Sequence, residues 1–308
     1  MRSLRRPKKP VTPDRPIAVV HERERRLDDG LVEVSTVFLA GSECPFSCVF
    51  CDLWRQTLDG PTQPGSLPRQ LERALAEVPH RSVIKLYNAS NFFDPIAVPM
   101  EDDPELLRLL SGFSQVTVES HPRFIGPRCF TFAERLAGRL EVAVGLETVH
   151  PEALSRLNKK MTLDDFNAAT GELLARRVGV RVFVLLGCPF VAADEQLDWT
   201  VRSVEHAARR GAGIISIIPV RGGNGALESL AADGAWSPVS LDLVEATFER
   251  ALRLGLENTI VQVDLWELDQ LAACGHCVNA RLTRLGAMNR TGVVLAQATC
   301  TWCGGNRP

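Results

Sequence analysis

Strand-like and helix-like segments alternate along most of this chain, and this alternation constrains the fold more than any other feature. Short apolar runs rich in β-branched residues predict strands, at 32–39, 82–87, 115–119, 140–146, 180–186, 213–220 and 259–263. Segments with apolar residues at helical spacing separate them, at 67–78, 104–110, 132–136, 163–175, 197–208 and 241–254. Repeated units of this kind predict an α/β protein with parallel strands, either a barrel or a doubly wound sheet. A partial barrel is favoured because reactive and charged residues recur where strands end, and such barrels carry their sites there.

Three cysteines follow the first predicted strand at C-x3-C-x2-C spacing: Cys44, Cys48 and Cys51. Cysteine thiolate is the usual ligand of iron–sulfur clusters, and this spacing lets one loop hold three corners of a cubane cluster. Because no fourth cysteine lies close by, one iron would stay open to a substrate or cofactor, as in catalytic metal sites. A zinc site or a storage cluster at the same cysteines is the alternative.

Four further cysteines form a C-x2-C-x22-C-x2-C pattern: Cys274, Cys277, Cys300 and Cys303. Two such pairs predict a closed metal site that stabilises a small segment, and structural zinc is favoured over an auxiliary iron–sulfur cluster or a redox dithiol. His276 is interpreted as a bystander. Three arginines between the pairs are candidates for contacts to RNA phosphates, the alternative being a ribbon packed on the barrel: Arg281, Arg284 and Arg290.

The net charge of −2 is unevenly distributed along the chain. Residues 1–26 carry +6, the residues after Asp269 carry +4, and the rest carries −12. We predict a flexible basic arm over 1–29, a barrel over 30–265 and a C-terminal metal-binding module over 266–308. Two basic ends on an acidic body suit a polyanion such as RNA, and a solvated tail with a small arginine-containing module is the alternative.

The composition predicts a cytoplasmic protein without a membrane segment. Hydrophobic residues make up 45% of the chain, yet no apolar run has the length of a membrane span or the form of a signal peptide. The clustered spacing among the nine cysteines indicates metal ligation in a reducing compartment more than disulfides.

Several motifs resemble the radical S-adenosylmethionine superfamily: the three-cysteine loop with Phe50 before its last cysteine, Glu119-Ser120-His121-Pro122, Gly145-Leu146-Glu147-Thr148, Leu157-Asn158-Lys159-Lys160 and Gly187-Cys188-Pro189-Phe190. The resemblance points to the branch that contains the elongator catalytic subunit, the tRNA methylthiotransferases and the radical partner of archaeosine synthase. It implies a partial (β/α)6 barrel over about 30–265, a 4Fe-4S cluster on Cys44, Cys48 and Cys51, and S-adenosylmethionine on the open iron. Reductive cleavage of that cofactor would then give a 5′-deoxyadenosyl radical.

The resemblance also implies roles for residues at the strand ends. Phe50 would lie against the adenine, while Ser90 and Asn91 stand where many members have a Gly-Gly-Glu-type segment that meets the methionine part of the cofactor. The alternatives are packing for Phe50 and loop capping for the other two.

Charged residues at other strand ends extend this set. Glu119 and Glu147 are expected to hold the cofactor's ammonium or ribose, or a substrate cation, and Glu147 is counted as catalytic. Arg221 could clamp a carboxylate or phosphate, and Lys159 and Lys160 could reach one. Solvent-facing roles are the alternatives for these residues, and Cys188 and Tyr87 are interpreted as packing residues.

The predicted function is a radical S-adenosylmethionine enzyme that modifies a tRNA nucleoside. Its alternatives are an enzyme of the same kind acting on a small metabolite or peptide, and a non-enzymatic metal- or RNA-binding protein. A reductant such as flavodoxin or ferredoxin is the expected protein partner, and tRNA is a candidate partner.

Overall fold

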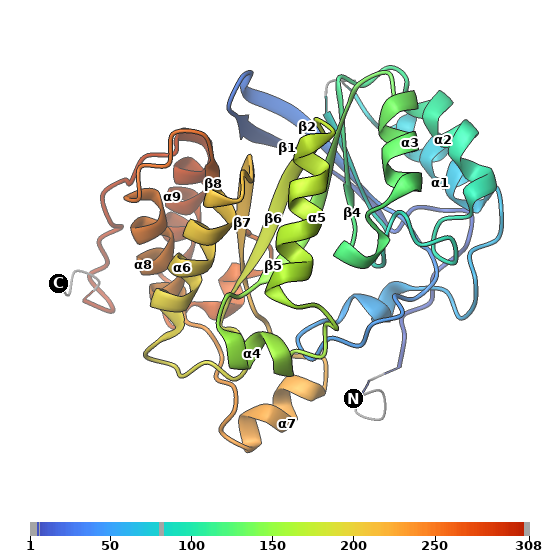
Figure 1. Cartoon of the computed structure of the whole chain (residues 1–308). Helices are drawn as coiled ribbons and strands as arrows, with labels where there is room; N and C mark the ends of the chain where they lie inside the picture. Colours follow the sequence, from blue (N-terminus) through green and yellow to red (C-terminus); the bar gives the residue numbers. More distant parts are fainter. Residues whose placement is uncertain (1–4, 6, 80–82, 305–308) are drawn as a thin grey trace.

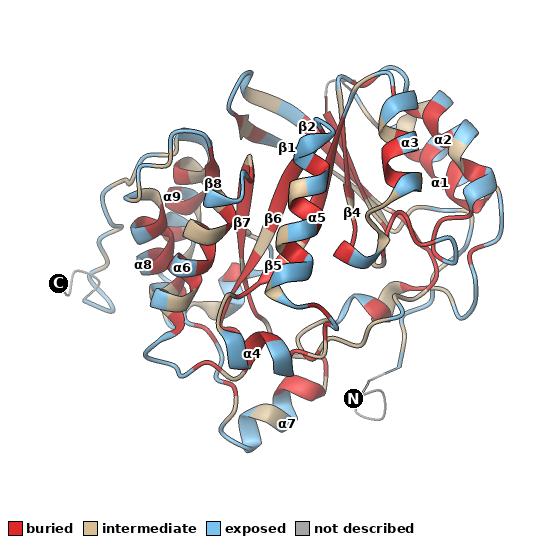
Figure 2. Cartoon of the chain, in the orientation of Figure 1, coloured by how far each residue is buried: buried red, intermediate tan, exposed pale blue. Residues whose placement is uncertain are grey.

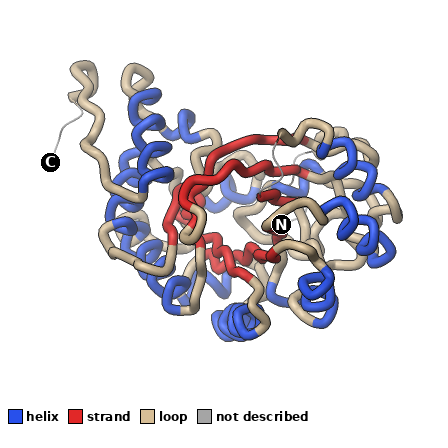
Figure 3. The backbone as a smooth tube through the Cα atoms, turned by 90° about the horizontal axis from the view of Figure 1, so that it is seen from above, coloured by secondary structure: helices blue, strands red, loops and turns tan. Residues whose placement is uncertain are grey.

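The computed structural model describes residues 5, 7–79 and 83–304. In that part of the chain the strands form one eight-stranded sheet in sequence order, which curves into an incomplete barrel with helices on its outside (Figures 1 and 3). The strands are β1 (Ala18–Arg26), β2 (Gly30–Phe38), β3 (Val83–Tyr87), β4 (Gln115–Glu119), β5 (Arg139–Glu147), β6 (Gly179–Leu186), β7 (Ile214–Pro219) and β8 (Ile260–Val263).

The α-helices are α1 (Ser66–Leu75), α2 (Asp103–Leu110), α3 (Pro127–Arg135), α4 (Pro151–Arg156), α5 (Leu163–Ala175), α6 (Gln196–Arg209), α7 (Ala226–Ala232), α8 (Leu241–Leu252) and α9 (Val278–Thr291). Single 3-10 turns occur at η2 (Leu53–Gln56), η3 (Met100–Asp102), η4 (Pro122–Phe124) and η5 (Leu268–Leu271).

Strands β2 to β8 are parallel, so their carboxyl ends meet at one end of the barrel. The short helices α4 and α7 and the N-terminal segment lie at this end, at the bottom of Figure 1. Strands β3 to β8 are mostly buried, whereas β1, the start of β2 and the helices also carry exposed residues (Figure 2). One apolar core unites the strands with the inner faces of the surrounding helices.

The predicted partial barrel is confirmed, and the predicted strands and long helices all occur close to their expected positions. Ser82, the expected first residue of the second strand, lies outside the described residues. The short helices α4 and α7, and the longer α9, were not predicted.

The flexible arm predicted over 1–29 is wrong for its second half, because Ala18–Arg26 forms β1, which pairs antiparallel with β2. The prediction failed because the last five residues of this strand, 22–26, are all charged. Glu24 and Arg26 are nevertheless only 5% and 7% exposed. Their side chains pair with buried groups of opposite charge. A strand whose polar face lay in solvent would need no such partners.

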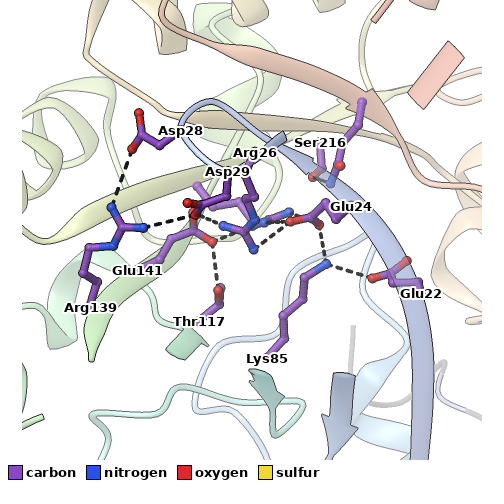
Figure 4. Close-up of polar contacts among 12 residues, drawn as sticks. Glu22, Glu24, Arg26, Asp28, Asp29, Lys85, Thr117, Arg139, Glu141 and Ser216 are labelled. Carbon is purple, nitrogen blue, oxygen red and sulfur yellow. Dashed lines mark hydrogen bonds and ion pairs between the residues drawn. The ribbon is translucent and has the colours of Figure 1, made fainter. Parts of the chain in front are cut away.

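Glu24, Arg26 and their partners form a buried cluster of charged side chains next to β1 (Figure 4). Glu24 accepts two hydrogen bonds from Arg181, at 2.6 and 3.0 Å, and also pairs with Lys85 and Arg26. Glu141 pairs with Arg181 and Arg26 at 3.0 and 3.2 Å. Each buried charge therefore has an opposite charge in contact, as the low dielectric of the interior requires.

Helix α9 lies against both β1 and β8, the two end strands of the sheet. The Asn289 amide accepts from the Val263 N–H at 2.9 Å and donates to the Val263 carbonyl at 2.8 Å, and so pairs with the free edge of β8. Leu285 and Met288 of the same helix are fully buried in the common core. Covering an edge strand in this way removes a surface that invites intermolecular pairing.

Candidate active site and second metal centre

The loop that carries Cys44, Cys48 and Cys51 begins directly after β2, at the carboxyl end of the barrel strands. All three cysteines are partly exposed residues and form no disulfide, but their thiol groups point inward. Burial raises the pKa of Cys44, raises that of Cys48 to about 12 and raises that of Cys51 further, because a thiolate is costly to desolvate. The positive charge of Lys159 acts in the opposite direction on Cys44 and Cys48. A cationic partner would compensate this desolvation, and cysteine thiolates are the usual protein ligands of iron–sulfur clusters.

Glu119, at the end of β4, faces the turn that follows β3. Its carboxylate accepts from the Asn88 N–H at 2.9 Å. Desolvation raises the Glu119 pKa to about 7, against the lowering effect of backbone donors at Asn88, Ala89 and Ser90. The Glu119 charge also acts on the Cys44 thiol, which places this carboxylate within electrostatic range of the cysteine loop.

The same turn holds buried polar atoms that have no hydrogen-bond partner in the described part of the chain. They are the Ser90 hydroxyl and both polar atoms of the fully buried Asn88 side chain. Ala89 between them has a left-handed φ of 55°, which costs energy for a residue other than glycine. Unsatisfied donors and acceptors beside a half-neutral carboxylate are the features of a binding site for a polar group.

Glu147 forms a buried ion pair with Lys159, which also donates to the Gly145 carbonyl at 2.6 Å. A bulge between Gly145 and Glu147 and a φ of 67° at Glu147 turn this carboxylate back over the end of β5. A Cβ atom at Gly145 would lie 2.0 Å from the carboxylate and 2.3 Å from the Lys159 amine, so only glycine admits the pair. The Glu147 charge acts on the Cys48 thiol, so this carboxylate lies within electrostatic range of the cysteine loop, but it already has a partner of opposite charge. Its expected role at a cofactor stays a prediction.

The remaining predicted site residues have protein contacts of their own. Phe50 packs against a small apolar cluster that includes Cys188, which is 2% exposed. Arg221 pairs with Asp264 at 2.6 Å, between the ends of β7 and β8. Lys160 is exposed. The expected contacts of Phe50 with adenine and of Arg221 with an anion stay predictions.

Sequence reasoning assigned no separate role to several residues that shape this region. His121 stacks on Phe46, with ring centroids 4.1 Å apart, and contacts the Lys159 carbonyl through Nε2 at 3.1 Å. Burial, with the nearby Lys159 charge, lowers the His121 pKa to about 4, so the ring is neutral at pH 7. Asn158 and Asn224 contact the cysteine loop from other strand ends. Asn158 belongs to a motif quoted above, but nothing local to Asn224 marks it.

The first part of the predicted arm also contacts the cysteine loop. Arg5 and Lys8 both pair with Glu43, next to Cys44, and the Arg5 guanidinium lies 4.8 Å from the Trp54 ring centroid. Arg5 and Trp54 line a small pocket together with Cys48 and Cys51. Of the other basic residues counted in the two ends, Arg2, Arg6 and Arg307 lie outside the described residues.

The four C-terminal cysteines converge, with their sulfur atoms all within 4.8 Å of one another. The Sγ atoms of Cys274 and Cys300 are 4.0 Å apart, and those of Cys277 and Cys303 are 3.8 Å apart. Backbone N–H groups of Cys303 and Trp302 lower the Cys300 pKa to about 7. Among the described residues this is the one group of His, Cys, Asp or Glu side chains placed to hold a single ion.

The arginines between these cysteine pairs have structural partners. Arg281 and Arg284 are 9% and 6% exposed and pair with Glu245 on α8, and Arg284 pairs with Glu249 as well. They are therefore engaged in packing α9 on α8, and the alternative of a segment packed on the barrel is the correct one for them. Arg290 is exposed. His276, the expected bystander, stacks on Trp302 with centroids 4.4 Å apart.

Comparisons with known proteins agree with this architecture. The chain is similar to the structure of archaeal Elp3 from Methanocaldococcus infernus, with a TM-score of 0.53 and 14% identity over 77% of this chain. It is also similar to Streptococcus suis SuiB bound to S-adenosylmethionine, with a TM-score of 0.52 and 11% identity over 74% of this chain. The archaeosine synthase subunit beta of Methanosarcina acetivorans is 26% identical over 171 residues, 51% of this chain. The predicted resemblance to radical S-adenosylmethionine enzymes is thus confirmed for the fold.

These similarities cover parts of longer proteins. The chain spans 49% of the archaeosine synthase subunit, 60% of the Elp3 chain and 47% of the SuiB chain. No family model matches the sequence. None of the helices in the described residues is long and apolar enough to cross a membrane.

Proposed function

We propose that this chain is a radical S-adenosylmethionine enzyme whose 4Fe-4S cluster is held by Cys44, Cys48 and Cys51. The observation that carries the proposal is the position of the three thiols on one loop at the carboxyl end of the barrel, beside unsatisfied polar atoms of Asn88 and Ser90. When bound, the cluster supplies the electron that cleaves S-adenosylmethionine to a 5′-deoxyadenosyl radical.

The residues present fit this pair of groups. Three desolvated thiols on a loop that carries no fourth cysteine suit a cluster with one open iron. Glu119 suits an ammonium group, because a cation beside it would compensate the desolvation that now raises its pKa to about 7. The Ser90 hydroxyl and the Asn88 amide supply the donors and acceptors that a bound amino acid moiety needs.

The test is anaerobic reconstitution with iron and sulfide, followed by dithionite and S-adenosylmethionine. We expect four irons per chain at the first motif and formation of 5′-deoxyadenosine, both lost in a Cys48→Ser, Cys51→Ser double variant. Cys129→Ser, which changes a core thiol on α3, is the matched control and should retain both. Four irons without any 5′-deoxyadenosine from the intact protein would refute the activity.

For the second centre we propose a single structural zinc ion. A tetrahedral site with Zn–S bonds of about 2.3 Å has S···S edges of about 3.8 Å. Two of the six separations are 3.8 and 4.0 Å, and all are within 4.8 Å. The cysteines of a cubane attach to different irons and lie further apart. Elemental analysis should give one zinc per chain after the reconstituted protein is desalted; additional iron bound by these four cysteines would contradict this assignment.

We further propose that the substrate is a nucleoside in tRNA and that the enzyme is cytoplasmic and reduced by a flavodoxin- or ferredoxin-type protein. Support comes from the relatives named archaeosine synthase subunit and Elp3. The exposed Lys9 and Arg15 precede β1, and the Lys9 N–H donates to the Arg55 carbonyl in the segment after the cysteine loop. Lys9→Glu with Arg15→Glu should weaken tRNA binding and reduce its salt dependence, because fewer phosphates are neutralised.

A peptide substrate is the second candidate, since SuiB was also solved with its precursor peptide and has the same fold, with a TM-score of 0.53. Absence of salt-sensitive tRNA binding by the intact protein at low ionic strength would favour this candidate over tRNA.

A further inference from the structure

Three asparagines from three separate strand-end segments donate hydrogen bonds to the cysteine loop. Asn91 follows β3, Asn158 follows α4 at the end of β5, and Asn224 follows β7. Asn91 and Asn224 are each 3% exposed. A buried side-chain amide needs several hydrogen-bond partners, so each of these asparagines holds the part of the loop that it contacts in place.

Two of the asparagines hold the backbone of the loop. The Asn158 amide donates to the Ser47 carbonyl at 2.8 Å and to its hydroxyl at 3.0 Å, one residue before Cys48. The Asn224 amide donates to the Val49 carbonyl at 2.9 Å and to the Cys51 carbonyl at 3.4 Å. These carbonyls flank the second and third cysteines, so the two asparagines set where those cysteines lie.

Asn158 and Asn224 are themselves fixed. Asn158 has a left-handed φ of 55°, which asparagine tolerates better than most residues. The Asn224 side-chain oxygen Oδ1 accepts from the Leu227 N–H at 2.8 Å, in the first turn of α7. A movement of the cysteine loop would therefore have to break its contacts with the segments that follow α4 and β7.

Asn91 differs because it contacts a cysteine sulfur. Its amide nitrogen lies 3.4 Å from the Cys44 Sγ, and its oxygen accepts from the His121 N–H at 2.7 Å. Both ends of the amide therefore have protein partners. This contact favours the cysteine loop, rather than the cofactor carboxylate, as what the Asn91 side chain serves.

We propose that the three asparagines position the cysteine loop and that Asn91, through its N–H···S hydrogen bond to Cys44, also raises the reduction potential of the cluster. This inference rests on the proposed 4Fe-4S cluster at Cys44, Cys48 and Cys51. Reduction adds negative charge to the cluster and its sulfurs, so a donor aimed at a ligand sulfur stabilises the reduced form more than the oxidised form. Loss of the donor lowers the potential and makes the electron transfer to S-adenosylmethionine more favourable but the cluster harder to reduce.

The experiment compares reconstituted Asn91→Asp and Asn91→Leu with the wild type, by iron content and by redox titration followed by electron paramagnetic resonance. Asp keeps the shape and the acceptor for His121, and Leu removes the donor without adding charge. Outer-sphere partners of metal ligands alter site properties by about tenfold or more, and tenfold in a one-electron equilibrium is about 59 mV. We expect the potential of both variants to fall by about this amount.

Asn224→Ala is the comparison for a backbone-only contact, with faster loss of iron expected and an unchanged potential. Asn167→Asp, a partner of His206 between α5 and α6, makes the same chemical change on other elements and should leave both measurements at their wild-type values. A wild-type potential and iron content in both Asn91 variants would overturn the inference. Failure of the wild type itself to bind four irons would instead overturn the proposed function, whatever the variants do.

Discussion

Removing the charge of Glu24 should destabilise the barrel far more than any exposed charge change in the same hairpin. The Glu24 side chain is 4% exposed and contacts three cations, Arg181, Lys85 and Arg26. Lys85 and Arg26 are labelled near it in Figure 4. In Glu24→Gln these cations stay buried, with Glu141 as their only deeply buried anion among the described contacts. Breaking a buried ion pair by removing one partner costs about 3–5 kcal/mol, a large part of the 5–15 kcal/mol that folded proteins have in total.

The hairpin offers a matched control. Glu33 on β2 pairs across the strands with Arg23 of β1, but the two side chains are 50% and 57% exposed. Glu33→Gln makes the same chemical change and should cost less than about 1 kcal/mol, as exposed pairs do. The free energy of unfolding is measured by urea denaturation for both variants and the wild type.

The pH dependence gives a second measurement of the same effect. Burial alone would raise the Glu24 pKa, but Arg181, Lys85 and Arg26 hold it well below its usual value of 4.5. A carboxyl with a lowered folded pKa contributes stability that is present above about pH 4.5 and is lost as the pH falls through the folded pKa. In Glu24→Gln this contribution should be absent, so the free energy of unfolding of the variant should fall less steeply at acid pH. Equal destabilisation by Glu24→Gln and Glu33→Gln at pH 7 would refute the argument that burial makes the difference.

Three further outcomes are expected. Burial raises the Glu119 pKa to about 7, so the stability that this group gives the cofactor-free protein falls as the pH rises from about 4.5 to 7. Glu119→Gln should remove this pH dependence of the melting temperature. It should also weaken S-adenosylmethionine binding, measured by calorimetry. Cys300→Ser should abolish zinc binding and lower the melting temperature, with hydrogen exchange increased mainly in α9, and unchanged exchange there would contradict a structural role. Asn289→Ala leaves the Val263 N–H and carbonyl unpaired at the β8 edge and should cost about 1–3 kcal/mol in urea denaturation, whereas a cost near zero would show that the edge is not held there.

Most of the parallel strands could be predicted because they are local, mainly apolar runs that stay buried on both faces, as in β6 (Gly179–Leu186). Strand β1 could not, because its inward residues are charged and their partners are far away in the sequence. Glu24 meets Lys85 across 61 residues and Arg181 across 157. Only the folded sheet brings these charges together, so no local sequence pattern indicates their pairing.

The candidate site divides in the same way. The cysteine loop is predictable because its ligands lie within eight consecutive residues, and cluster chemistry dictates that spacing. The asparagines that hold the loop act across the barrel: Asn158 contacts Ser47 over 111 residues and Asn224 contacts Val49 over 175. The prediction for Glu147 identified a strand-end carboxylate but not its pairing with Lys159, which depends on a bulge in β5.

The position of α9 gives a physical reason for a metal site in the C-terminal segment. An incomplete barrel leaves two end strands, β1 and β8, and α9 lies against both. The helix begins directly after Cys277, and residues 293–299 that lead to Cys300 contain no regular helix or strand. A metal ion joining Cys274 and Cys277 to Cys300 and Cys303 would tie this irregular segment to the start of α9. The second centre would thereby hold the helix that covers the edge of the sheet, while the proposed first centre, at the carboxyl end of the strands, would serve the chemistry.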